Sequence, residues 1–309
     1  MSLGTPIRTG KRISGQMYTP ELAHRLNNLR EKHVGAREQW EKPTAVLVEG
    51  SHTFSPERKG KLKKHMKLVN GEFCDTVLQA NTKFRTHLPS ILLTTTNFVL
   101  GAHNPATDLA RMIRSEHPAT VIVAIEQGEI KLNNIERRLF DLVFERIEDL
   151  ELAASQIRRK LMQAKIAIFD DETSIVDFYH EKLYDQVRIV SQRRIEDVDE
   201  ALRISRLAKP DIIIIDLDWT KDSEAGKRRG SDGIYLPEGL EFIGKLRLES
   251  PETIVILQSA SVSPEDRTKE LEARIENARF DAIYKKFAGE KIVRTVLRIA
   301  HEITQEELI

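Results

Sequence analysis

The sequence has a single cysteine, no long apolar segment and no net charge. Cys74 alone cannot form an internal disulfide or supply an all-cysteine zinc site within one chain, which fits the cytosol. No run of 18 or more uncharged apolar residues is present, so no membrane-spanning helix is predicted. The first residues also lack the apolar stretch of a signal peptide. We therefore expect a cytoplasmic globular protein.

The zero net charge conceals two unlike halves. Residues 1–163 carry 25 Lys and Arg against 18 Asp and Glu, a balance of +7. Residues 164–309 carry 23 against 30, a balance of −7. An acidic half is consistent with carboxylates gathered around a metal, and a basic half could bind an anionic partner. The two halves could also attract each other. The length suits two domains of ordinary size.

Residues 131–163 are expected to form one long helix. Apolar residues recur there with alternating spacings of three and four, which is the heptad pattern. They are Phe140, Val143, Ile147, Leu150, Ala154, Ile157 and Leu161. Two interpretations stay open, an amphipathic helix packed on its own domain and a coiled coil that forms a homodimer. Either would connect an N-terminal domain at 1–130 to a C-terminal domain at 164–309.

Residues 164–309 alternate between strand and helix patterns. Strands are expected at 165–170, 187–190, 211–217, 253–258 and 280–285, and helices at 173–183, 195–207, 237–248, 264–278 and 291–306. The isoleucine run 212–215 is apolar on both faces, as in a parallel strand covered by helices on each side. The pattern predicts an α/β fold with a doubly wound, five-stranded parallel sheet.

Polar residues stand at the carboxyl ends of four of these strands. They are Asp170 with Asp171, then Asp216, Ser259 and Lys285. In a doubly wound sheet the carboxyl ends of the strands meet at one edge, beside the point where strand order reverses. Carboxylate oxygens suit a divalent ion such as Mg2+, and an ammonium suits a phosphoryl oxygen. The sequence therefore predicts a magnesium site at this edge, with a cation available for a phosphoryl group.

Four segments resemble the CheY-like receiver domains of two-component signalling. They are Ile166–Glu172 (IAIFDDE), Lys209–Asp218 (KPDIIIIDLD), Thr253–Ser261 (TIVILQSAS) and Ile283–Phe287 (IYKKF). The resemblance implies a response regulator in which Asp216 accepts a phosphoryl group. The donor would be a sensor histidine kinase, a phosphotransfer protein or a small phosphodonor. No enzyme activity is implied beyond self-phosphorylation and autodephosphorylation.

The same resemblance implies roles for the polar residues. Asp171 and Asp216 would bind Mg2+ directly, Asp170 would help through water, and the carbonyl of Asp218 would complete the protein ligands. Because phosphoryl transfer has a loose, charge-rich transition state, positioning and positive charge can supply most of the catalysis. Ser259 and Lys285 would each contact a phosphoryl oxygen.

The chain departs from the family near this lysine and in one loop. Lys286 stands where a proline usually follows the lysine. Lys285 is placed in the site because Phe287 then matches its family position, and a slip of one residue stays open. Ala282 stands three residues before Lys285, where most members carry the aromatic residue that reports phosphorylation, and this puts that coupling in doubt. An insertion of about fifteen residues at 219–237 is either a lid or docking loop or a neutral insertion, since loop length costs little.

The N-terminal half resembles no family that we can name. It has three apolar runs, at Thr44–Val48, Ser90–Leu100 and Thr120–Ile125, and a helical pattern at 108–116. A small α/β domain is predicted. The last two runs are faintly similar to the third and fourth strands of a receiver. Thr94, Thr95 and Thr96, however, stand where an acceptor aspartate would be needed.

Two segments of this half suggest other partners. A basic run could contact nucleic-acid phosphates, although such a run is more often a solvated helix face and no helix-turn-helix pattern accompanies it. It consists of Arg58, Lys59, Lys61, Lys63, Lys64, His65 and Lys67. The segment ELAHRLNN at 21–28 looks like the histidine box of some sensor kinases, with His24 as acceptor. Without a glycine-rich nucleotide-binding box, it would serve a phosphorelay and not a kinase.

The predicted function is thus a response regulator phosphorylated on Asp216 with Mg2+. Two alternatives remain open. The receiver could be a non-switching scaffold or interaction module, or the chain could be a nucleic-acid-binding regulator that uses its basic half.

Overall fold

The computed structural model divides into two compact units. One is Gln39–Met162, called the 39–162 unit below, and the other joins Met1–Glu38 to Gln163–Ile309, called the 163–309 unit. The structure describes residues 20–38, 42–49, 55–69, 77–96, 105–126, 131–145, 150–191, 197–217, 237–259, 280–286 and 288–305. The described residues 20–38 thus group with the C-terminal half, whereas the sequence predicts an N-terminal domain at 1–130. No helix in the described ranges is long and apolar enough to cross a membrane.

A five-stranded parallel sheet forms the centre of the 163–309 unit. Its strands are β6 (Lys165–Phe169), β7 (Arg188–Ser191), β8 (Ile212–Asp216), β9 (Ile254–Ser259) and β10 (Ala282–Lys285). Their order is β10-β9-β8-β6-β7. The predicted doubly wound sheet is confirmed. Because the chain leaves β6 in one direction to form β7 and returns past it to form β8, strand order reverses between β6 and β8.

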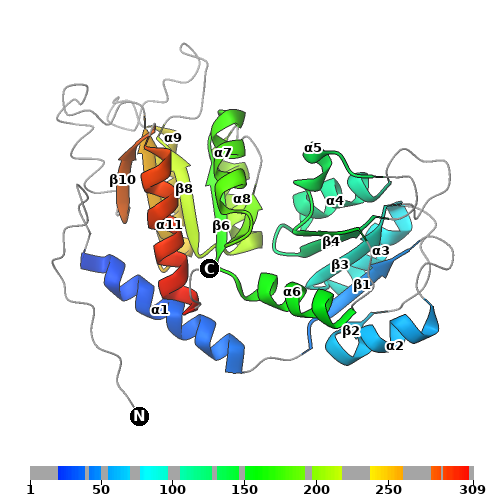
Figure 1. The fold of residues 1–309 in the computed structure, drawn as a ribbon. Coiled ribbons are helices and arrows are strands. Elements are labelled where there is room, and N and C mark those ends of the chain that lie inside the picture. The colour runs from blue at the N-terminus through cyan, green and yellow to red at the C-terminus, as the bar shows by residue number, and fades with distance from the viewer. Residues whose placement is uncertain are drawn as a thin grey trace. The chain divides into compact units, whose positions relative to one another are not determined.

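Helices cover both faces of this sheet (Figure 1). One face packs on α7 (Thr173–Leu183) and α11 (Gly289–Thr304), and the other on α8 (Val198–Ala208) and α9 (Glu238–Glu249). Strand side chains alternate between the two layers, as Ile168 and Phe169 illustrate. Both layers are apolar, which is why these strands appear in the sequence as continuous isoleucine and valine runs. The helix predicted at 264–278 lies outside the described residues.

Helix α1 (Pro20–Glu38) belongs to this unit and crosses the amino ends of its strands (Figure 1). Leu22, Leu26 and Leu29 share one face of α1 and are buried in the same core as α7 and α11. Arg25 donates a 2.8 Å hydrogen bond from Nε to the carbonyl of Pro251, just before β9. Near the other end, His33 Nε2 lies 3.1 Å from Asp211 Oδ2, just before β8.

The 39–162 unit also has a five-stranded parallel sheet. Its strands are β1 (Thr44–Val48), β2 (Lys67–Leu68), β3 (Ile91–Thr95), β4 (Val121–Ile125) and β5 (Leu142–Phe144), and its longer helices include α2 (Pro56–His65), α3 (Val77–His87) and α4 (Pro105–Glu116). The three predicted apolar runs form β1, β3 and β4. β2 and β5 were not predicted, because two or three residues are too few to show an alternating pattern.

The two sheets have the same topology. The order in the 39–162 unit is β2-β1-β3-β4-β5, so in both units the strands, numbered within the unit, run 2-1-3-4-5. The registers also correspond. In the 39–162 unit Val48 of β1 pairs with Thr94 of β3, and in the 163–309 unit Phe169 of β6 pairs with Ile215 of β8. The residue after this pair is Thr95 in β3 and Asp216 in β8.

The prediction of a single helix over 131–163 is wrong. The segment forms α5 (Asn134–Arg137), β5 and α6 (Leu150–Met162). A carboxylate just before β5, that of Asp141, accepts a 2.7 Å hydrogen bond from the backbone N–H of Ile122 and so ties β5 to β4. Strand pairing thus overrides the heptad spacing, and Ile157 is buried in the core of its own unit, not along the seam of one long coiled coil.

Candidate functional site

Three carboxylates meet at the carboxyl edge of the 163–309 sheet. Asp170 and Asp171 directly follow β6, and Asp216 is the last residue of β8. Each offers an oxygen within 4.8 Å of the others. The pairing of Phe169 with Ile215 explains this, because it sets the next residues of the two strands, Asp170 and Asp216, side by side. All three are buried, with exposed fractions of 0%, 8% and 4%.

The lysine of the site is Lys286, not the predicted Lys285. Lys285 is exposed at the end of β10, whereas the Nζ of Lys286 lies 2.7 Å from Asp216 Oδ2 and 3.3 Å from Asp170 Oδ1. It also lies 3.7 Å from Asp171 Oδ1 and 3.0 Å from Glu172 Oε1.

The alternation of side chains along β10 accounts for this correction. Ala282 and Tyr284 face the core beneath α7 and α11, while Ile283 faces the opposite core. A residue of even number therefore points toward the carboxylates, and Lys285 points away from them. The position three residues before the site lysine is then Ile283. It is no more aromatic than Ala282, so the departure from the family remains.

Ser259 closes β9 beside this lysine. It is 1% exposed, and its carbonyl accepts a 2.9 Å hydrogen bond from the backbone N–H of Lys286. This contact fixes the end of β10 against the end of β9. Asp218 and residues 219–236 of the insertion lie outside the described residues, as does Ser261.

Burial and charge shift the proton affinities at this edge. Burial raises the pKa of Asp216 to about 7, although the hydrogen bond from Lys286 opposes the shift. Burial also raises the pKa of Asp170 above its ordinary value. The pKa of Lys286 is raised as well, because its hydrogen bond to Asp216 and the surrounding carboxylates outweigh its burial. Lys286 therefore stays an ammonium, and Asp216 and Asp170 ionise less readily than free carboxyl groups.

The donor set fits a divalent cation. Asp170, Asp171, Asp216 and Glu172 supply four carboxyl groups around the single ammonium of Lys286. When ionised, they leave negative charge that one lysine cannot balance. Hard oxygen ligands of this kind are what Mg2+ prefers.

Two residues near the carboxylates were missed by the sequence analysis. Gln258 donates a 2.7 Å hydrogen bond from Nε2 to Asp170 Oδ2, and the hydroxyl of Tyr179 donates one of the same length to Gln258 Oε1. Both side chains are fully buried. A glutamine inside an otherwise apolar strand was the sequence signal that could have indicated this contact.

Gly239 allows close packing behind Asp216. Gly239 is the second residue of α9, and a methyl group on it would lie 2.9 Å from the carbonyl oxygen of Leu217 and also against that of Asp216. Only glycine therefore fits at this position without moving the end of β8. This gives a structural reason for the Glu238-Gly239 pair that follows the insertion.

The corresponding edge of the 39–162 unit has a different composition. Thr95 stands in the register position of Asp216 and is buried, as are Thr94 and Thr96. Among the described residues, the three aspartates of the 163–309 unit are the only acidic group close enough to share an ion.

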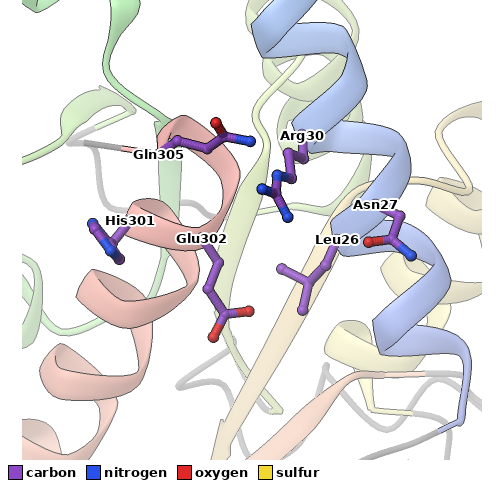
Figure 2. Close-up of a pocket in the computed structure, with 6 residues that line it drawn as sticks. All are labelled: Leu26, Asn27, Arg30, His301, Glu302 and Gln305. Atoms are coloured by element: carbon purple, nitrogen blue, oxygen red, sulfur yellow. The ribbon is translucent and has the colours of Figure 1, made fainter. Parts of the chain in front are cut away.

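A pocket of about 400 Å³ lies between α1 and α11 (Figure 2). Its lining consists of Leu26, Asn27, Arg30, His301, Glu302 and Gln305. Helix α11 starts near the carboxyl end of β10 and runs back toward the amino ends, so its last turn is far from Asp216. The pocket is therefore separate from the carboxylates.

His24 lies on α1 at the same amino edge of the sheet. It is exposed and contacts Asn28, while its neighbour Arg25 binds the carbonyl before β9. A five-residue strand spans about 16 Å, so the amino and carboxyl edges are at least that far apart. Direct phosphoryl transfer from His24 to Asp216 within one chain is incompatible with this arrangement.

Comparison with known proteins identifies receiver structures. No protein-family model and no curated protein matches the chain. Three similar solved structures are a receiver domain from Vibrio parahaemolyticus, a chemotaxis response regulator from Vibrio cholerae and a response regulator from Thermotoga maritima. Their identities are 15%, 22% and 20%, and their TM-scores 0.35, 0.34 and 0.33.

These similarities span 46%, 44% and 45% of this chain and 94%, 98% and 98% of the other chains. The chain is thus similar to whole receiver domains over less than half of its own length. The similarities assign no activity to it, and its chemistry follows from the carboxylates and Lys286.

Proposed function

We propose that this chain is a two-component response regulator in which Asp216 accepts a phosphoryl group. Asp170, Asp171 and Asp216 would hold Mg2+ beside it. The observation that carries the proposal is the 2.7 Å contact between Lys286 Nζ and Asp216 Oδ2 inside a buried group of carboxylates. A cation beside an acid at the carboxyl edge of a doubly wound sheet suits transfer of a charged group.

The roles follow from the positions of the side chains. A carboxylate oxygen of Asp216 attacks the phosphorus of the donor and forms a new P–O bond. The bond from phosphorus to the oxygen of acetyl phosphate, or to the nitrogen of a phosphohistidine, breaks and its electron pair leaves with the donor. Lys286 pairs with one phosphoryl oxygen and the Ser259 hydroxyl donates to another. Bound Mg2+ would supply further positive charge for the phosphoryl oxygens.

The donor would be a sensor histidine kinase or a phosphotransfer protein. Phosphorylation changes the contacts of Lys286, because the phosphoryl oxygens compete with Asp216 for its ammonium. Lys286 directly follows β10 and is linked to β9 through the carbonyl of Ser259. A shift at this point would alter the surface that the unit presents to partners.

Intact mass measurement after incubation with MgCl2 and acetyl phosphate tests the proposal. We expect one phosphoryl adduct on the wild-type chain that requires Mg2+ and is absent from Asp216→Asn. Asp199→Asn is the matched control, because it replaces the same carboxylate by an amide on an exposed helix face. Loss of the adduct in both variants, or an adduct that survives Asp216→Asn, would contradict the assignment.

The alternative of a non-switching scaffold predicts a different result. The chain would bind Mg2+ but form no adduct with acetyl phosphate or with a cognate kinase. The nucleic-acid alternative is weakened at two positions of α2, which carries much of the basic run. Lys59 pairs with the buried Glu49, and Lys61 pairs with Glu57 one turn earlier on the exposed face of α2.

A further inference from the structure

A buried chain of hydrogen bonds runs from α7 through β9 to the acidic site. It starts at the hydroxyl of Tyr179, passes through the side-chain amide of Gln258 and ends at Asp170 Oδ2, with 2.7 Å at each step. Tyr179, Gln258 and Asp170 are each 0% exposed. Water therefore does not replace any of these partners.

The donors and acceptors of this series of hydrogen bonds are fixed in one order. Burial and the charges of Asp170 and Asp216 raise the pKa of Tyr179. Its hydroxyl therefore stays protonated and donates the hydrogen bond to Gln258. The amide of Gln258 must then turn its oxygen to Tyr179 and its N–H to Asp170. If Gln258 flipped, its amide oxygen would face the carboxylate oxygen of Asp170, and its N–H would face the donating hydroxyl of Tyr179.

The other oxygen of Asp170 is also held. Its Oδ1 accepts a 2.7 Å hydrogen bond from the backbone N–H of Glu172 and lies 3.3 Å from Lys286 Nζ. The Gln258 amide therefore fixes the remaining freedom of the carboxylate, which is rotation about its last bond. In metal sites, partners of this kind orient the groups that face the ion.

We propose that Gln258 and Tyr179 are positioning residues for Mg2+ binding, with Tyr179 acting through Gln258 and Gln258 acting through Asp170. This inference rests on the proposed function for the identity of the site. The inference goes further because it makes Mg2+ affinity depend on the buried hydrogen bonds from Tyr179 of α7 through Gln258 to Asp170, called the relay below.

Titration calorimetry of the full chain with MgCl2 alone tests the relay. Gln258→Met, which keeps the size and removes both polar atoms, is expected to weaken Mg2+ binding about tenfold. Tyr179→Phe is expected to weaken it less, because Gln258 keeps its bond to Asp170 and loses only the partner of its amide oxygen. In the double variant, Tyr179→Phe should add no further loss, since its effect passes through Gln258.

Tyr284→Phe is the matched control. Tyr284 is buried in the same core as Tyr179, and its hydroxyl bonds to Thr295 and not toward the carboxylates. Both phenylalanine variants should lower the melting temperature similarly, by about 3 °C. Only Tyr179→Phe should change Mg2+ affinity.

Equal Mg2+ affinity in Tyr179→Phe and Tyr284→Phe would overturn the role of Tyr179, and wild-type affinity in Gln258→Met would overturn the relay. Additive losses in the double variant would show that Tyr179 acts by another route. Because no phosphodonor is present, failure of the relay is distinct from failure of phosphorylation at Asp216.

A second inference concerns the 39–162 unit and rests on its topology. Its sheet repeats the strand order of the 163–309 unit, and Thr95 occupies the register position of Asp216. Glu126 follows β4 where Ser259 ends β9. Its side chain is fully buried, and it accepts 2.7 Å and 3.1 Å hydrogen bonds from Arg137 and the backbone N–H of Leu132.

We infer that the 39–162 unit is a second unit of receiver topology whose carboxyl edge is fixed by internal ion pairs and does not accept a phosphoryl group. Arg137 and Lys131 neutralise Glu126, and Lys59 does the same for the buried Glu49 after β1. Among the described residues of this edge, the buried carboxylates of Glu126 and Glu49 are thus already paired with cations.

The Asp216→Asn chain tests this inference. After incubation with MgCl2 and acetyl phosphate, we expect no adduct and no modified peptide from residues 42–145. A phosphoryl group on any of these residues would overturn it. Glu126→Gln should also lower the melting temperature of the unit by several degrees, because it leaves Arg137 without a charged partner. An unchanged melting temperature would contradict the fixed edge.

Discussion

The Nζ of Lys286 lies 2.7 Å from Oδ2 of Asp216, and the exposed fractions of the two side chains are 5% and 6%. This buried pair is the centre of the proposed site. Its lysine reaches three further carboxylates, so among the described residues it supplies positive charge to all four. Under the proposed function, the same ammonium has two roles, one in charge balance and one in binding a phosphoryl oxygen.

Replacing Lys286 by methionine should separate these roles. Loss of a preorganised cation for the phosphoryl oxygens is expected to slow adduct formation from acetyl phosphate roughly a hundredfold. The affinity for Mg2+ should not fall, because the ammonium and the ion compete for the same carboxylates. Mass-detected phosphorylation rates and MgCl2 titrations measure the two effects.

Lys285→Met is the matched control, since it makes the same change one residue earlier on an exposed side chain. We expect its phosphorylation rate to stay within about twofold of wild type. If Lys285→Met slowed phosphorylation more than Lys286→Met did, Lys285 would be the lysine of the site.

The raised pKa of Asp216 predicts how stability depends on pH without metal. Its folded-state pKa of about 7 lies above the ordinary 3.8, so the protonated form favours folding and the ionised form opposes it. The contribution of this group to stability is full below pH 4 and declines as the pH rises through 7. In EDTA, Asp216→Asn should therefore gain roughly 2 to 3 kcal/mol over wild type between pH 5 and pH 8.

Urea unfolding at several pH values measures this difference. A constant difference between the two chains from pH 5 to pH 8 would be inconsistent with the raised pKa. Asp199→Asn again serves as control, because its carboxylate is 91% exposed and should show no such change.

Gly239 and Gly244 offer a matched pair on α9. A methyl group at Gly239 would press on the backbone of Leu217 and Asp216, whereas one at Gly244 would meet nothing within 4 Å. Gly239→Ala should cost about 2 kcal/mol and slow phosphorylation, because it moves the end of β8. Gly244→Ala should stabilise the helix by about 1 kcal/mol and leave phosphorylation unchanged. Equal effects on phosphorylation would show that Gly239 does not set the position of Asp216.

The acidic part of the site was predictable from the sequence because it depends on local order. Asp170 and Asp171 directly follow one apolar strand and Asp216 ends another, and parallel strands place such residues at one edge. The lysine was harder to place, because a shift of one residue in a strand reverses the side-chain direction. In the structure Tyr284 faces the core, and because side chains alternate along β10, Lys286 and not Lys285 reaches the carboxylates.

Features that depend on distant contacts were not predictable in this way. The 131–163 segment has heptad spacing, yet Asp141 and the pairing of β5 with β4 interrupt it. The attachment of α1 to a sheet more than a hundred residues later depends on buried leucines and ion pairs that no local pattern reveals. The relay from Tyr179 to Asp170 likewise joins residues from three separate elements.

The ion pair between Arg25 and Asp281 makes α1 an integral part of the 163–309 unit. Asp281 is fully buried before β10 and also binds Arg247 of α9 at 2.8 Å. Arg25→Ala should cost about 2 to 3 kcal/mol, since it removes one partner of a buried carboxylate along with the bond to Pro251. Hydrogen exchange should rise in α11 and at the starts of β9 and β10.

Lys32→Ala provides the comparison on the same helix. Lys32 lies 3.5 Å from the buried Asp211, but its side chain is 51% exposed, so the change should cost no more than about 0.5 kcal/mol. Urea unfolding and hydrogen exchange of both variants decide the point. If Arg25→Ala were as mild as Lys32→Ala, α1 would be a loosely attached segment, and the buried positions of Leu22, Leu26 and Leu29 would not stabilise the unit.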